Sequence, residues 1–198
     1  MTATVFDVAA ELIQRSGGQS MSTVKLQKLC FFAFGWYAHL TGESLFPEPF
    51  YAMEHGPVVG ELLSAHAGKT VVGLDRLAEQ MTERDGSLTQ LDPYAARVVD
   101  AVWDFYGHLS KWQLVDKTHT EDVWRQAWEG RPQGSKRGMM AQVDIIRYFV
   151  ARTTRPEEHI ELPPSAVSFL SDDDLRQIEE QAKPCSTFVD AVRSLASV

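Results

Sequence analysis

The stretch TVKLQKLCFFAFGWYAHL, residues 23–40, holds two lysines and one glutamine among side chains that are mostly apolar. A helix with almost no polar face is buried on all sides by its neighbours. Ser22 is placed to cap such a helix, and Gly42 is placed to end it. The stretch therefore predicts a buried central helix around which the other elements pack.

Gln27 and Lys28 interrupt this apolar helix, so both need hydrogen-bond partners or a route to solvent. We expect Gln27 to bond a neighbouring backbone, such as the turn at residues 55–57. We expect Lys28 to lay its stem along apolar surface and to expose its ammonium group.

The elements around this helix are predicted from spacing and from turn residues. Residues 50–53 favour a short strand, and Gly56-Pro57 favours the start of a helix with Pro57 at its first position. Residues 68–91 show little periodicity and read as a variable surface loop. An earlier helix is indicated by apolar residues spaced along one face: Val5, Val8, Ala9, Leu12 and Ile13.

The second half of the chain predicts further helices. Asp92-Pro93 marks the start of one, and Ser110 with Gln113 has the form of a capping box. A last helix over residues 140–150 would bury Val143, Ile146 and Val150. The predicted fold class is mainly α, a compact multi-helix domain with a minor short β element and a helical C-terminal extension.

Charge divides the 198 residues unevenly. The net charge is −8, and residues 153–198 carry nine acidic against four basic side chains. We therefore predict a domain over residues 1–152 and an acidic helical extension over residues 153–198. Five carboxylates of the extension are candidates for contact with a basic partner surface: Asp172, Asp173, Asp174, Glu179 and Glu180.

Composition and spacing argue against several classes of protein. No apolar run approaches the ~20 residues of a membrane span, and no secretory signal is visible, so we expect a cytoplasmic protein. A net negative charge argues against nucleic acid as the partner. Asp116 and His119 keep a metal-dependent hydrolase open as an alternative, but no motif with metal-ligand spacing supports it, and we expect no cofactor, no metal and no catalysis.

Several motifs follow one another in the order of a known family. They are Lys25-Leu26-Gln27-Lys28-Leu29, Trp36, His55-Gly56-Pro57-Val58, Trp112-Gln113, His119 and Trp124. With these motifs the chain resembles the Panacea-domain family of SocA-like, phage-associated antitoxins over about residues 5–150.

The resemblance implies a non-enzymatic antitoxin that binds and neutralises a protein toxin encoded by an adjacent gene. It also implies one alternative, an adaptor that delivers the toxin to a protease. A DNA-binding autoregulator is a further alternative, and self-association is left open. The motif residues are expected to act mainly in the fold. The layout of the chain favours toxin specificity in the variable loop at residues 68–91 and in the acidic tail, and Lys28 is a further candidate for toxin contact.

Overall fold

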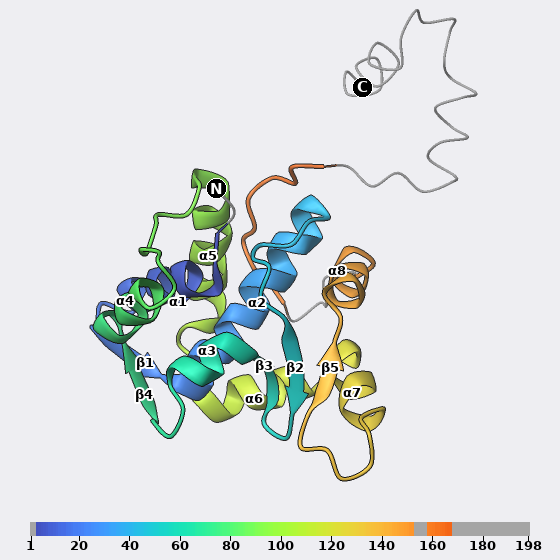
Figure 1. Cartoon of the computed structure of the whole chain (residues 1–198). Coiled ribbons are helices and arrows are strands. Elements are labelled where there is room, and N and C mark those ends of the chain that lie inside the picture. Colours follow the sequence, from blue (N-terminus) through green and yellow to red (C-terminus); the bar gives the residue numbers. More distant parts are fainter. Residues whose placement is uncertain (1–2, 153–157, 168–198) are drawn as a thin grey trace, which may run out of the picture. The chain divides into compact units, whose positions relative to one another are not determined.

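The computed structural model describes residues 3–152 and 158–167 (Figure 1). Residues 1–165 form one compact unit, and residues 166–198 belong to a second. The helices of the described part are α1 (Val5–Arg15), α2 (Thr23–Thr41), α3 (Gly60–Ala65), α4 (Leu74–Thr82), α5 (Pro93–Tyr106), α6 (Lys111–His119), α7 (Asp122–Glu129) and α8 (Gln142–Val150). The strands are β1 (Ser20–Ser22), β2 (Phe50–Met53), β3 (Gly56–Val59), β4 (Val71–Gly73) and β5 (Gly138–Met140).

The prediction of a mainly α fold is confirmed, but the β structure is more extensive than the single short element expected. Strands β3, β2 and β5 form an antiparallel three-stranded sheet in that order, and β1 pairs with β4 in a separate antiparallel sheet. The extra strands are only three or four residues long. Segments so short carry too few residues for an alternating pattern to stand out in the sequence.

Helix α2 occupies the centre of the unit, as its composition predicts. In Figure 1 it runs between α1, α4 and α5 on one side and the three-stranded sheet with α8 on the other. Phe31 and Trp36 are among its fully buried side chains. Gly42 ends the helix in the left-handed region at φ 71°, whereas the side chain of Ser22 makes no capping hydrogen bond.

The prediction that Gly56-Pro57 begins a helix is wrong. Residues 56–59 form β3, which pairs with β2 so that Ala52 faces Pro57 and Phe50 faces Val59. A proline cannot donate to a neighbouring strand, so it is tolerated at a sheet edge, and β3 is an edge strand. The third helix starts only at Gly60.

Residues 68–91 are also more ordered than predicted. They contain β4 and α4, and Val72, Leu77 and Met81 from these elements are buried in the core. The apolar residues of α4 do follow a helical spacing, but the helix is only nine residues long. So short a stretch between polar segments gives a weak periodic signal.

The buried face of α8 differs from the predicted one. Ile145 and Phe149 are fully buried, whereas Val143 is 57% exposed. Both stripes of this helix are apolar, so helical periodicity alone did not select between them. Met140 is not helical, because it pairs with Phe50 in the sheet and the helix begins at Gln142.

A buried ion-pair network holds the end of the compact unit. Arg152 Nη1 lies 3.0 Å from Glu121 Oε2, and Arg152 Nη2 lies 2.6 Å from Glu158 Oε2. Further along, Tyr94 donates to the carbonyl oxygen of Pro164 and Ser165 donates to that of Leu40. Residues 158–165 are therefore fastened to the helical unit, although the predicted extension began at residue 153.

Candidate site around Lys28

Lys28 lies on α2 with only 1% of its surface exposed. Its Nζ donates a hydrogen bond of 2.8 Å to the carbonyl oxygen of Pro57 on β3. The prediction that Lys28 exposes its ammonium is therefore wrong. Burial disfavours the charged form and lowers the pKa of Lys28 to about 7.

Gln27 binds the same strand two residues further on. Its Oε1 accepts a 2.8 Å hydrogen bond from the Val59 N–H, and its Nε2 lies 3.4 Å from the Val59 oxygen. The N–H and C=O groups of one residue point to the same side of a strand. Residues 57 and 59 therefore present one edge of β3 to α2, and Gln27 and Lys28 satisfy that edge in place of another strand. The prediction that Gln27 bonds a neighbouring backbone holds, at Val59 rather than in the turn.

His66 follows α3 and is buried beside Gln27, with its Nε2 3.1 Å from Gln27 Nε2. Because the Val59 N–H fixes Oε1 as the acceptor of the amide, Gln27 Nε2 must be the donor toward His66. His66 Nε2 is then the acceptor, so the proton of the neutral ring lies on Nδ1. Burial lowers the pKa of His66, which agrees with an uncharged ring.

Gly56 permits the close approach of the hairpin to Lys28. Its φ of +93° is a conformation that other residues rarely adopt. A Cβ atom at this position would lie 3.0 Å from Lys28 Cε and 2.5 Å from Thr118 Oγ1. A glycine at position 56 therefore lets the turn approach the side chain of Lys28 closely.

A cavity of about 310 Å³ opens over these groups. Lys28, Gln27 and His66 form part of its lining, with His55 and Lys69 among the exposed residues that also line it. Apolar lining residues come from α2, β2, β3 and the region of α3: Val24, Met53, Val58, Leu63 and Ala67. The lining of the cavity thus combines apolar side chains with a buried lysine.

An exposed tryptophan lies next to this cavity. The ring of Trp112, on α6, contacts the ring of His55 edge to face with centroids 5.5 Å apart. Trp112 is 51% exposed, and Lys111 Nζ lies 5.3 Å from its ring centroid. Because half of Trp112 is exposed, packing in the core does not explain a tryptophan at this position. Its neighbour Gln113 has a structural role, since it completes the capping box with Ser110.

His119 and Trp124 belong to an aromatic stack. The His119 ring lies parallel to Trp124 at 4.0 Å, and Trp124 lies parallel to Trp128 at 6.2 Å. Trp124 Nε1 also donates to the carbonyl oxygen of Met53. Burial, and then the charge of Lys28, lower the pKa of His119.

The Asp116 and His119 pair does not form part of a larger ligand set. Asp116 is exposed on α6, while the His119 ring packs on Trp124. Within residues 3–152 and 158–167, no group of three His, Cys, Asp or Glu side chains is arranged to hold a metal ion. The expectation of a protein without metal stays a prediction.

The other motif residues contact the framework. Lys25 Nζ donates to the carbonyl oxygen of Gly107, and Trp36 Nε1 donates to the Tyr106 hydroxyl. Leu26, Leu29 and Val58 are buried. The five candidate carboxylates at residues 172–174, 179 and 180 lie outside the described residues.

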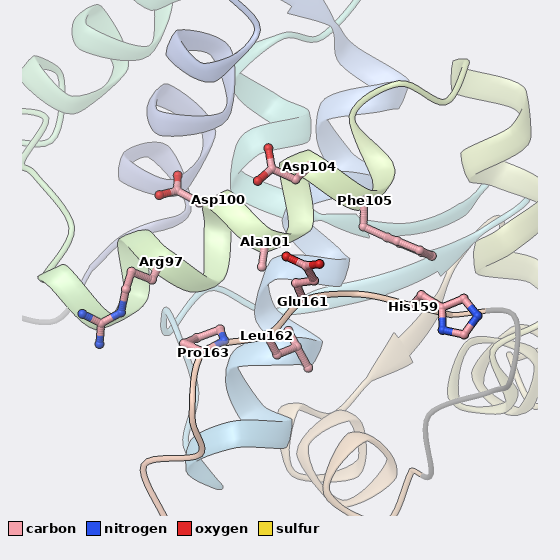
Figure 2. A pocket seen from close by; sticks show the side chains of 9 residues that line it. All are labelled: Arg97, Asp100, Ala101, Asp104, Phe105, His159, Glu161, Leu162 and Pro163. Carbon is pink, nitrogen blue, oxygen red and sulfur yellow. The ribbon is translucent and has the colours of Figure 1, made fainter.

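A larger cavity, of about 550 Å³, lies between α5 and residues 159–163 (Figure 2). Asp100, Asp104 and Glu161 give it an acidic lining, and Asp100 pairs with Arg15 at 2.8 Å. Its charged lining residues are exposed or half-buried. The smaller cavity is chemically more distinctive, because a buried lysine is one of its lining residues.

A model of the family described as "Antitoxin SocA-like, Panacea domain" matches residues 26–125, about half of the chain. The chain belongs to this family. No curated protein and no solved structure matches it. The matched range includes most of the residues that line the cavity over Lys28, together with Trp112 and the His119–Trp124 pair, and it ends before α8 and Arg152. No helix in the described part of this Panacea-domain protein is long and apolar enough to cross a membrane.

Sequence reasoning found Gln27, Lys28 and His55 but missed His66 and Lys69. Both lie in the segment between α3 and β4, part of which was read as a variable loop. A lone histidine in such a segment carries no spacing signal. Its role depends on a contact with Gln27, 39 residues away in the sequence.

Proposed function

We propose that this protein is the antitoxin of a toxin–antitoxin pair and neutralises its toxin by direct binding. The observation that carries the proposal is membership of the SocA-like Panacea family over residues 26–125. The toxin of such a pair would be encoded by an adjacent gene.

The surface around Trp112 supports direct binding. Tryptophan is favoured as an anchor in protein interfaces, and a half-exposed indole loses its remaining contact with water when a partner covers it. His55 supports one edge of the ring, and Lys111 lies over it. This arrangement holds the indole in place before binding, which limits the conformational entropy lost in the complex.

The test combines growth and inhibition assays with the product of the neighbouring gene. Cells that make this toxin should grow only when the antitoxin is also made, and the two purified proteins should form a complex. The purified antitoxin should also inhibit the toxin without any protease present. Rescue that needs a protease would replace the proposal with the adaptor alternative.

A matched pair of surface variants tests the Trp112 surface. Trp112→Ala should keep the melting temperature within a few degrees and weaken toxin binding by about 30- to 1,000-fold, the range of an interface hot spot. Met139→Ala is the control, because Met139 is 65% exposed on β5. Equal binding by both variants would move the toxin contact away from Trp112.

The DNA-binding alternative has its own measurement. An autoregulator would shift its promoter DNA, with an affinity that falls steeply as salt rises. We expect no such shift from a chain with a net charge of −8.

A further inference from the structure

We propose that the cavity over Lys28 is a binding site for a carboxylate group carried on a small apolar body, with the Lys28 ammonium as the recognising group. This site borders the surface at Trp112, since His55 belongs to both, but it needs no toxin to be tested.

The first argument is the incomplete hydrogen bonding of Lys28. A charged lysine side chain has three donors. Within the described residues, Lys28 Nζ donates to one acceptor, the carbonyl oxygen of Pro57, at 2.8 Å. A buried ammonium with unused donors is costly, and an anion in the cavity would supply the missing acceptors and the opposite charge.

The second argument is the charge around the cavity. Lys28 and Lys69 line it together with one carboxylate, that of Glu54, which is exposed. Gln27 and His66 bond to each other, and Gln27 bonds to Val59, so these groups form a fixed wall. The cavity is therefore prepared for an anion that reaches Lys28.

The third argument concerns the kind of anion. Several of the lining residues are apolar, among them Val24, Val58 and Leu63, and the volume of about 310 Å³ lies at the small end of the range for ligand sites. One buried ammonium matches one negative charge, whereas a phosphate dianion would bring an excess charge into a poorly solvated place. A monocarboxylate with a short hydrocarbon chain satisfies both the amine and the apolar lining residues.

Two sources can present this chemistry, namely a free organic acid or a carboxylate-bearing segment of a protein partner. Isothermal titration of the full-length protein with 4-methylpentanoate tests the shared chemistry. The neutral 4-methylpentanamide and inorganic phosphate serve as the comparison ligands. We expect the acid to bind at least about tenfold more tightly than either, since hydrogen bonds to charged groups are the strong ones.

Proton linkage identifies the group that binds. Because burial lowers the pKa of Lys28 to about 7, the free protein at pH 8.5 holds this amine mostly neutral. Binding of the acid should then take up about one proton, and the affinity should fall about tenfold per pH unit above pH 7.5. The other titratable or charged groups around Lys28 are Glu54, His55, His66 and Lys69 in the lining of the cavity, and His119, whose pKa the charges of Lys28 and Asp116 also affect.

The matched variants are Lys28→Met and Lys25→Met, neighbouring lysines on α2 of which only Lys28 lines the cavity. Lys28→Met should weaken binding of the acid at least tenfold and abolish the proton uptake, whereas Lys25→Met should keep both. Should Lys28→Met fail to fold, NMR titration of the Lys28 Cε resonance in the native protein decides. Binding of the acid must raise the pKa of that amine.

Three results would each overturn the proposal and leave a water-filled cavity. They are equal affinity for the acid and the amide, no binding of the acid at millimolar concentration, and a Lys28 pKa that the acid leaves unchanged. The two sources are separated by competition. Displacement of the acid by the toxin identifies a carboxylate of the partner, and retention of the acid in the complex identifies a free acid. A protein that fails to neutralise any toxin would still bind the acid, so the two proposals fail separately.

Discussion

The Nζ atom of Lys28 lies 2.8 Å from the carbonyl oxygen of Pro57, which joins the buried face of α2 to the outer edge of a β-sheet. The same edge receives the amide of Gln27 at Val59. A residue other than proline at position 57 would point its N–H at α2, toward the Lys28 ammonium, which is a donor and not an acceptor. A residue without an N–H avoids that conflict.

The first prediction concerns stability and pH. The folded protein releases the Lys28 proton near pH 7, whereas the unfolded chain holds it to about pH 10.5. In this window the unfolded state binds more protons, so Lys28 makes the folded state more stable as pH rises, by up to about 1.4 kcal/mol per unit. Urea unfolding should therefore show that the free energy of unfolding of the wild type rises from pH 7.5 to 9.5 relative to that of Lys28→Met. Parallel curves would contradict the buried position of the amine.

A second prediction concerns the sheet edge. Gln27→Met leaves the buried N–H of Val59 without its acceptor, at a cost of about 1–3 kcal/mol in the free energy of unfolding. Amide exchange at Val59 should accelerate at the same time. The matched change Gln126→Met, at an exposed position on α7, should cost much less.

Gly35 supplies a third prediction. A Cβ atom there would overlap the ring of Phe149, which is itself packed against Phe31 and Trp36. Alanine favours a helix by about 1 kcal/mol over glycine, but overpacking a core costs about 1–3 kcal/mol. We expect Gly35→Ala to lower the melting temperature, and Phe149→Leu to lose less stability in that background than in the wild type. A more stable single variant would show that the Phe149 ring has room to move.

The fourth prediction separates the fold from the acidic tail. A chain ending at Arg152 lacks Glu158 and leaves Arg152 short of a buried partner, which should cost about 3–5 kcal/mol. A chain ending at Val167 keeps that ion pair and should have the melting temperature of the full-length protein. If the chain ending at Val167 binds the toxin more weakly than the full-length protein does, residues 168–198 contact the toxin. Equal binding would show that they do not. Glu158→Gln is the point control for the ion pair.

A fifth prediction concerns Trp124. Trp124→Ala should cost about 3–5 kcal/mol, since the ring is 6% exposed and lies between His119 and Trp128. Trp124→Phe keeps an aromatic ring and loses the hydrogen bond to Met53, so about 1–2 kcal/mol is expected. Chemical denaturation measures both. An unchanged unfolding curve for Trp124→Ala, with neutralisation lost, would instead make Trp124 part of the interface.

The sequence by itself determined the elements whose causes are local. An apolar run of helix length placed α2 at the centre, and caps within four residues of a helix start fixed α5 at Asp92 and α6 at Ser110. The motifs also identified the family. These signals act between residues that are neighbours in the chain, so they can be read without a fold.

Only the tertiary structure decided how the site is built. Pro57 suits either the first turn of a helix or an edge strand, and the pairing with Ala52 and the donor from Lys28, 29 residues away, selected the strand. The apolar stripes of α8 were equivalent in the sequence until packing against α2 buried Phe149 and left Val143 outside. The same holds for Lys28, whose side chain suits a surface as well as a core. Its amine is buried because the edge of β3 supplies an acceptor, the Pro57 carbonyl oxygen, and a buried donor needs such a partner.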